Sequence, residues 1–132
     1  MINILLLMLL CHVLDDFVFQ IPSLSKLKQR RWWEENCPDG KYKKDYLMAL
    51  GMHALSWSVM IHLPIMVLCV IPEGITALSV LINLAVHMWI DDAKANKLRL
   101  NLIEDQAAHI LQVVATWIVM TIIIYCRMKA QF

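Results

Sequence analysis

Residues 105–126 read DQAAHILQVVATWIVMTIIIYC, and this stretch decides the fold. Beyond its first residue it contains no Asp, Glu, Lys or Arg. It is long enough to cross a bilayer as a helix, which needs about 20 mostly apolar residues. Three comparable stretches precede it, at residues 1–21, 46–71 and 75–90. The sequence therefore predicts an all-α membrane protein, a four-transmembrane-helix bundle that forms a single transmembrane domain over residues 1–132.

The composition agrees with this prediction and excludes other classes of protein. Of the 132 residues, 60% are apolar, which is unusual for a soluble domain. Four spans and short links use up the chain, so no separate soluble domain is expected. The formal net charge is only +1, and the basic residues form no stripe among aromatic side chains. No nucleic-acid partner is therefore expected.

The basic residues gather in two connecting segments, residues 22–45 and 91–104. The first holds seven of them beside Trp32 and Trp33, and it predicts a short amphipathic segment at the membrane interface. The second holds three. Because four spans put both segments on one side, and basic loops resist translocation, we expect that side to be the cytoplasm.

Three of the predicted spans carry, within the span or directly at its end, a histidine and an aspartate four residues apart, which places both on one face of a helix. These pairs are His12 and Asp16, His87 and Asp91, and Asp105 and His109. Ionisable residues inside a membrane cost about 2.5–3.5 kcal/mol each, so they should face the bundle interior and find partners. His53 adds a fourth imidazole early in the second span.

The predicted topology brings all of these residues to the cytoplasmic end of the bundle. Imidazoles and carboxylates that converge from several helices are what a metal site inside a bundle requires. The candidate ligands are His12, Asp16, His53, His87, Asp91, Asp105 and His109. Gln20 and Gln106 are candidates for orienting these ligands or a bound water.

The ligand types favour a divalent metal. Neutral imidazole and carboxylate suit zinc best here, with manganese and iron as alternatives. The number of candidate ligands leaves one or two ions open. A competing interpretation is a polar network in which histidines and aspartates form charge-assisted hydrogen bonds between helices without metal.

Other polar residues are predicted to lie outside this site. His62 is nine residues from His53 and therefore falls on nearly the opposite face of its helix. Asp15 and Asp92 are expected to point about 100° away from the faces of Asp16 and Asp91, toward the interface, with a different helix register as the alternative.

These residues predict a metal-dependent hydrolase that acts on a lipid or a lipid-linked phosphate or acyl ester at the membrane surface. The metal would activate water, and Asp16, Asp91 or Asp105 would serve as ligand or general base. An anionic headgroup would be held by four basic side chains at the same interface, Arg30, Arg31, Lys94 and Lys97.

Two other functions are consistent with the same residues. The first is a non-enzymatic membrane protein that uses a structural metal or polar network and binds another membrane protein or a second copy of itself. An open coordination position would distinguish the enzyme from it. The second is a proton or metal-ion conduit. It is disfavoured because the other half of the bundle offers only His62 and Asn83 as relay residues.

The motifs also carry a resemblance. His12-x-x-x-Asp16-Phe17-x-x-Gln20, His53, His87-x-x-x-Asp91 followed by Lys94, and Asp105-Gln106-x-x-His109 resemble a family of small polytopic bacterial and phage membrane proteins of unknown function. The pattern is more loosely similar to membrane-bound metal-dependent hydrolases. The resemblance implies a multi-pass protein of the bacterial inner membrane. The doubled acids Asp15-Asp16 and Asp91-Asp92 depart from it and leave open which member of each pair is the ligand.

Overall fold

The computed structural model describes residues 1–68 and 71–130, and within these ranges the chain forms helices and no strand. The elements are α1 (Ile2–Val13), η1 (Leu14–Phe19), α2 (Pro22–Leu27), α3 (Arg30–Asn36), α4 (Asp45–Leu68), α5 (Glu73–Ala95) and α6 (Leu102–Ala130). Residues 69 and 70, near the end of the predicted second span, lie outside the described ranges. The all-α fold class is confirmed.

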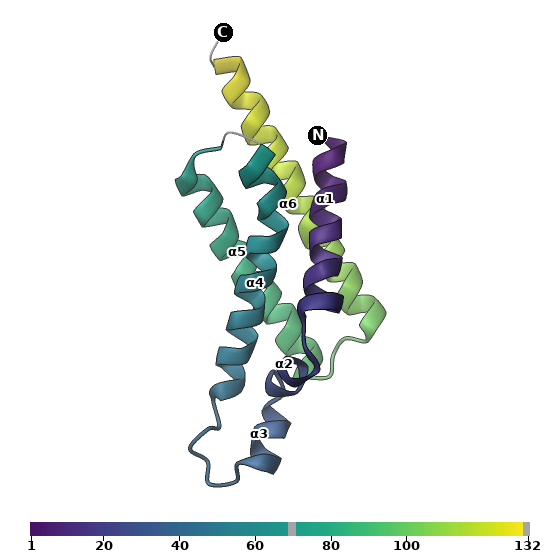
Figure 1. The fold of residues 1–132 in the computed structure, drawn as a ribbon, viewed down its shortest axis with the longest axis vertical. Helices are drawn as coiled ribbons and strands as arrows, with labels where there is room; N and C mark the ends of the chain where they lie inside the picture. The colour runs from purple at the N-terminus through teal and green to yellow at the C-terminus, as the bar shows by residue number, and fades with distance from the viewer. Residues whose placement is uncertain (69–70, 131–132) are drawn as a thin grey trace.

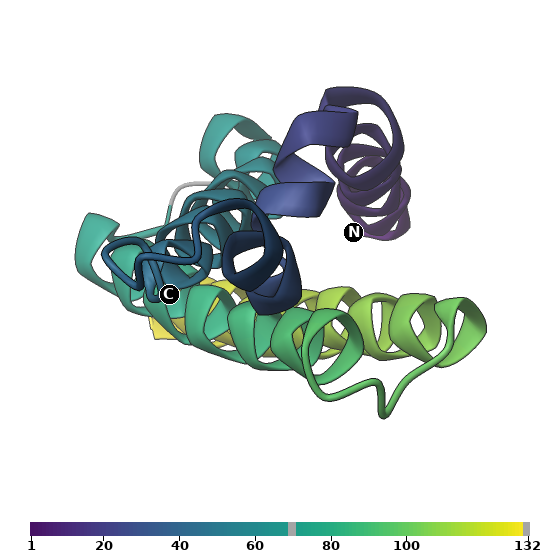
Figure 2. The same cartoon turned by 90° about the horizontal axis from the view of Figure 1, so that it is seen from below.

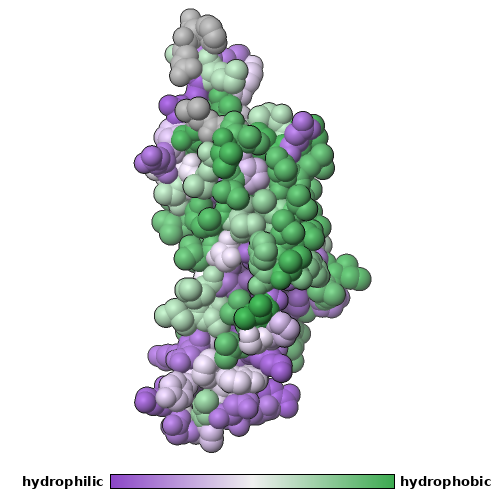
Figure 3. Space-filling view, viewed as in Figure 1, coloured by the Kyte–Doolittle hydropathy of each residue, from purple (hydrophilic) through white to green (hydrophobic). Residues whose placement is uncertain are grey.

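Four helical segments of the described chain are long and apolar enough to cross a membrane. They are Ile2–Phe19, which joins α1 to η1, and the helices α4, α5 and α6. Figure 3 shows an apolar surface over most of the molecule and a hydrophilic end built by α2, α3 and the link that follows them. The four predicted membrane helices are therefore present, and one end of the molecule is suited to the aqueous interface.

The long helices form a ring in which each contacts the next. α1 packs on α4, α4 on α5, α5 on α6, and α6 on α1. The start of α1 and the end of α6 lie at one end of the molecule, whereas α2, α3 and the link between α5 and α6 lie at the opposite end (Figure 1), which faces the viewer in Figure 2. The two basic connecting segments are thus at the same end.

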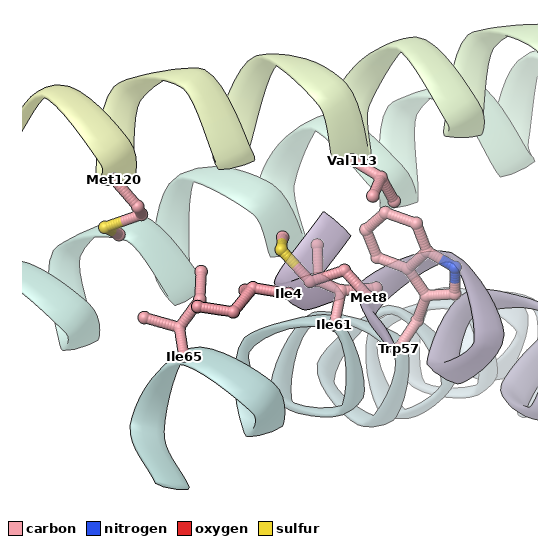
Figure 4. Close-up of a cluster of buried hydrophobic side chains, with 7 residues drawn as sticks. All are labelled: Ile4, Met8, Trp57, Ile61, Ile65, Val113 and Met120. Atoms are coloured by element: carbon pink, nitrogen blue, oxygen red, sulfur yellow. The ribbon is translucent and has the colours of Figure 1, made fainter. Parts of the chain in front are cut away.

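An apolar cluster fills the interior on the side of the termini. Its buried members come from α1, α4 and α6 and are Ile4, Met8, Trp57, Ile61, Ile65, Val113 and Met120. Trp57 lies at one end of this cluster, beside Val113 (Figure 4). Its indole N–H donates to His12 and its ring stacks on His87, so Trp57 separates the apolar interior from the polar one.

Helix α5 continues to Ala95, whereas the sequence predicts that its span ends at Ile90. The extra turn carries Asp91, which is buried, and it closes with an N–H⋯O bond from Asn96 to the Asp92 carbonyl (3.0 Å). The predicted interfacial segment contains two short helices, α2 and α3.

The first span ends in a π-helix, η1. The N–H of Gln20 donates to the carbonyl of Asp15 (3.0 Å), five residues back, which widens the turn. A wider turn lowers the angle between neighbouring side chains compared with an α-helix. Such turns are rare and occur frequently at functional sites.

Candidate metal centre

Polar side chains from all four long helical segments meet inside the bundle at its hydrophilic end. Each is at most 7% exposed: His12, Asp15 and Asp16 on α1 and η1, His53 on α4, His87 and Asp91 on α5, and Asp105 and His109 on α6. The apolar outer surface of the helices leaves this interior as the place where charged groups escape lipid.

Five of these residues offer ligand atoms at the spacing that a metal ion requires. One group is Asp16, His53 and His87, and the other is His87, Asp91 and His109; within each group the ligand atoms lie within 4.8 Å of one another. We call these five residues the ligand cluster. Metal bonds of about 2.1 Å in a tetrahedral site put ligand atoms about 3.4 Å apart. The cluster therefore needs little rearrangement to surround an ion.

The individual distances in the ligand cluster fit ligation better than hydrogen bonding. His53 Nε2 lies 3.4 Å from Asp16 Oδ1 and 3.6 Å from Asp91 Oδ2. His109 Nε2 lies 3.4 Å from Asp91 Oδ1, and His87 Nε2 lies 3.8 Å from the same oxygen. These exceed ordinary N–H⋯O lengths. Asp91 Oδ1 faces His87 and His109, whereas its Oδ2 lies near His53 and is bonded to Lys28, so the spacing leaves one or two ions open.

Several buried atoms in this interior have no hydrogen-bond partner within the described part of the chain. They are Asp15 Oδ2, Asp16 Oδ1, both ring nitrogens of His87, Asp105 Oδ1 and His109 Nδ1. Buried polar groups in folded proteins are nearly always paired. A cation bound in the ligand cluster would supply the missing partner to Asp16 Oδ1 and to one ring nitrogen of His87.

His12 has a different environment from the other three histidines of the site. Its Nδ1 accepts a hydrogen bond from Trp57 Nε1 (2.9 Å), which occupies that nitrogen's lone pair. It belongs to neither group of potential ligands. The Trp57 ring stacks on His87 with centroids 4.2 Å apart and planes at 25°, so it packs against one wall of the ligand cluster. Sequence spacing alone did not mark this tryptophan.

The position of Asp15 differs from the sequence prediction, in which its side chain points toward the interface. It is 1% exposed, and its Oδ1 accepts a hydrogen bond from Ser56 Oγ (2.6 Å). Its Oδ2 lies 3.6 Å from His53 Nδ1, while His53 Nε2 faces the ligand cluster. The wide turn of η1 allows both neighbouring acids to enter the bundle. Asp15 is therefore placed to orient His53, as carboxylates commonly orient metal-binding histidines.

Asp92 lies where the sequence predicts, away from the ligand cluster. Its side chain is 22% exposed and pairs with Lys97 (2.6 Å). His62 is also separate from the cluster, although it is buried, because its ring nitrogens bond the Ser58 carbonyl and the Ser79 hydroxyl (2.7 Å each).

Asp105 borders the cluster from α6. Its Oδ1 lies 3.5 Å from His109 Nε2, and its Oδ2 accepts a hydrogen bond from Lys94 Nζ (2.6 Å). Gln106 Nε2 donates to Asp105 Oδ2 (3.2 Å) and to Asp16 Oδ2 (3.4 Å). Gln106 thus joins acids from two helices, whereas Gln20 accepts a hydrogen bond from Lys28 Nζ (3.3 Å) at the edge of the site.

Lys28 is a site residue that the sequence did not single out. It belongs to the turn after α2, yet it is only 7% exposed, and its Nζ donates to Asp91 Oδ2 (2.7 Å). A signal was present in the sequence, because Lys28 shares a helical face with the apolar Leu24 four residues before it. A lysine on the apolar face of an amphipathic segment is placed to point inward.

The four basic residues predicted to hold a headgroup are all paired within the chain. Arg30 and Arg31 bind Glu34 and Glu35 one turn further along α3, with both arginine side chains exposed. Lys97 binds Asp92, and Lys94 binds Asp105. Of these four, only Lys94 lines the polar pocket described next.

A pocket of about 300 Å³ opens beside the ligand cluster. Its lining includes the carboxylates of Asp16, Asp91 and Asp105 and the ammonium groups of Lys28 and Lys94. It lies between η1, α2, α5 and the start of α6, at the hydrophilic end of the bundle. The acids of the site are thereby accessible to a small polar group from outside.

Comparison with known proteins identifies the family to which this chain belongs. A family model described as "Protein of unknown function (DUF3307)" matches residues 4–130. No curated protein and no solved structure matches this chain. The predicted resemblance to a family of unknown function is thus confirmed, whereas its likeness to metal-dependent hydrolases has no support among these comparisons. Because the match covers nearly the whole chain, including the entire ligand cluster, this protein belongs to the DUF3307 family.

Proposed function

We propose that this protein is a metal-binding integral membrane protein that hydrolyses an ester of a lipid or lipid-linked molecule at the membrane surface. The observation that carries the proposal is the ligand cluster, in which Asp and His atoms from four helical segments lie at ligand spacing beside an accessible pocket. A structural metal site is closed, whereas a catalytic one keeps a position open to substrate.

The charges of the site favour a divalent cation. Asp15, Asp16, Asp91 and Asp105 are four buried carboxylates, and Lys28 and Lys94 are the two ammonium groups bonded to them. With neutral histidines, two negative charges remain uncompensated. Buried charges that lack partners are costly, and at least one divalent ion is needed to balance these two. Mixed nitrogen and oxygen ligands suit zinc, with manganese and iron as alternatives.

The residues around the pocket supply the remaining parts of a hydrolase. A metal held by the ligand cluster would polarise the ester and activate water. Asp105 is our candidate for the general base, because Lys94 and Gln106 fix one of its oxygens and the other is buried without a partner. Asp15 orients His53, and Gln106 holds Asp16.

We further propose that the site faces the cytoplasm from the inner membrane of a bacterium. The support is the basic character of the two connecting segments, which share the end of the bundle where the pocket lies. Membrane lipids, whose headgroups lie at this depth, are the expected partners.

Metal analysis of the purified protein tests the first part of this proposal. We expect wild type and His62→Ala to retain about one or two divalent ions per chain after dialysis, and His87→Ala to retain none. His62 is the matched control because it is an equally buried histidine outside the ligand cluster. If wild type retains no metal even after purification with added zinc, manganese or iron, the metal site is refuted.

Turnover tests the second part. Metal-loaded protein in detergent is incubated with labelled phospholipids and acylglycerols, and released products are measured. We expect hydrolysis to depend on metal and to fall about 100-fold or more in Asp105→Asn, the range for loss of a general base. If metal is bound and none of these esters is cleaved, the enzymatic proposal fails while the metal site stands.

A second candidate function is a non-enzymatic membrane protein held together by this polar interior. The observation in its favour is that Lys28 and Lys94 pair with Asp91 and Asp105, which neutralises two of the four buried carboxylates. The turnover experiment separates the two functions, because only the enzyme predicts product release.

A further inference from the structure

Two lysines enter the polar pocket from different walls and end beside the ligand cluster. Lys28 comes from the end of α2 and Lys94 from the last turn of α5. Lys28 Nζ contacts Asp91 Oδ2 (2.7 Å) and Gln20 Oε1 (3.3 Å), and Lys94 Nζ contacts Asp105 Oδ2 (2.6 Å). The site therefore combines carboxylates that could bind a metal with two ammonium groups, which cannot be metal ligands.

Metal binding would weaken the hydrogen-bond acceptor that Lys28 has in Asp91. When Asp91 donates its oxygens to a cation, it becomes a weaker acceptor for Lys28, and Lys28 is too deeply buried to turn into water (side chain 9% exposed). A buried ammonium group without a strong acceptor is unstable. An anion that enters the pocket beside the metal would supply that acceptor.

We propose that Lys28 and Lys94 form the anion-binding part of the site and hold the phosphate group of a phosphorylated lipid. This inference rests on the proposed function and narrows its substrate from esters in general to phosphate esters. The metal would take one phosphate oxygen, and the two ammonium groups, which lie on different walls of the pocket, would take others.

The donor arrangement distinguishes phosphate from an acyl ester. A carbonyl offers one neutral oxygen, which is a poor partner for two ammonium groups, whereas a phosphate offers several charged oxygens and forms stronger bonds with each cation. The pocket also presents the neutral polar side chains of Ser25 and Gln29, which suit the remaining polar atoms of a headgroup.

The pocket mouth distinguishes a lipid from free phosphate. Phe17, Leu98 and Leu102 line the pocket and are 59%, 85% and 57% exposed. Leu98 adopts a φ of 52°, which non-glycine residues rarely use. Apolar side chains at the rim of a polar pocket would contact the glycerol backbone or chains of a lipid, and inorganic phosphate has no part that uses them.

Equilibrium binding to the full-length, metal-loaded protein in detergent tests the proposal. The probes are dihexanoyl phosphatidate in its phosphonate form, which the proposed hydrolase could not cleave, dihexanoyl glycerol and inorganic phosphate, and bound metal is measured in the same samples. We expect phosphatidate to bind and dihexanoyl glycerol not to bind. Lys28→Gln and Lys94→Gln should each weaken phosphatidate binding about tenfold or more, the usual loss for a hydrogen bond to a charged group.

Two further variants serve as controls. Lys26→Gln removes the same charge two residues away, on the exposed side of α2, and should bind phosphatidate as wild type does. Lys28→Arg keeps the charge and should bind more tightly than Lys28→Gln. Retained metal in every variant shows that the bundle is folded.

Each outcome decides a separate point. If metal is present and phosphatidate binding is absent or unaffected by Lys28→Gln and Lys94→Gln, the phosphate site is refuted and the metal site stands. If inorganic phosphate binds as tightly as phosphatidate, the lipid is refuted as ligand. If the protein holds no metal yet binds phosphatidate through both lysines, the proposed hydrolase fails and the phosphate site survives.

Discussion

His53 lies between carboxylates that approach its two ring nitrogens from different directions. Asp15 Oδ2 is 3.6 Å from Nδ1, and Asp16 Oδ1 is 3.4 Å from Nε2. If Nε2 binds a metal, Nδ1 carries the proton and donates it toward Asp15. The negative charge of Asp15 then makes the imidazole a better ligand and fixes its orientation.

Replacing this carboxylate should therefore weaken metal binding without removing a ligand. Asp15→Asn keeps the oxygen that accepts the Ser56 hydrogen bond and removes the charge. We expect metal affinity to fall roughly 10- to 100-fold, measured by competition with a chelator of known affinity. Asp92→Asn, the matched control, removes an acid outside the ligand cluster and should leave the affinity near that of wild type. Equal losses in both variants would contradict an orienting role.

At this scale the sequence predicted some positions and missed others for physical reasons. The spacing of four residues placed His87 with Asp91 on one face of a regular α-helix, and both meet in the structure. The same rule failed for Asp15, because it assumes an α-helical turn where the chain forms η1. Lys28 was missed because its partner Asp91 lies 63 positions away in the sequence.

At the scale of elements, the helical part of the first connecting segment (residues 22–36) is joined to the end of α5 by hydrogen bonds of one side chain, Asn96. Asn96 Oδ1 accepts a hydrogen bond from the Arg30 N–H (2.7 Å), and Asn96 Nδ2 donates to the Lys28 carbonyl (3.2 Å). It also donates to Asp92 Oδ1 (2.9 Å). Asn96 therefore fixes the backbone on both sides of Gln29 and keeps Lys28 directed into the pocket.

Asn96→Ala should loosen this segment while the four long helices stay folded. We expect faster amide hydrogen exchange across residues 22–36 in this variant, because local opening no longer breaks these bonds. Exchange in α4 should be unchanged. The control is Asn101→Ala, which removes a cap from the start of α6, where Asn101 Oδ1 accepts from the N–H groups of Ile103 and Glu104. Unchanged exchange across residues 22–36 in Asn96→Ala would refute the tie.

The existence of the long helices could be predicted because each is an apolar run of membrane-spanning length. Their ends were harder to predict. Asp91 and Asp92 read as the start of a polar loop, yet α5 continues through them because Asp91 is buried against Lys28 and the histidines. Hydropathy measures the cost of a charge facing lipid and does not register a partner supplied by another helix.

At the scale of the whole molecule, an even number of spans puts both basic connecting segments at one end, and the structure has them there (Figure 1). The order of neighbours in the ring could not be predicted, because similar apolar runs carry little information about which helix packs on which. The convergence of the ligand cluster could nevertheless be predicted without the order of the helices in the ring. That prediction required only that the residues lie at the same end of the bundle and on helix faces that point inward.

The proposed orientation can be measured by labelling in intact cells. Asp39→Cys places a thiol in the exposed link between α3 and α4, and Glu73→Cys places one at the exposed start of α5, near the opposite end. Each is introduced with the natural cysteines replaced by serine. A membrane-impermeant maleimide should label Glu73→Cys before lysis and Asp39→Cys only after lysis, since basic segments stay in the cytoplasm. The reverse pattern would place the pocket on the outer side.

Metal removal should change the stability of the entire bundle, because the ligand cluster draws on all four long helical segments. An ion that binds only the folded protein stabilises it by about 2.7 kcal/mol when its free concentration is 100 times Kd. We therefore expect a chelator to lower the thermal unfolding midpoint of wild type in detergent and added metal to restore it. His62→Ala should show the same metal-dependent shift, since it keeps every member of the cluster, and His87→Ala should show none. A chelator that leaves the midpoint of metal-loaded wild type unchanged would mean that the four helices are held by their lysine–aspartate pairs and apolar packing alone, so that a cation contributes nothing to the fold.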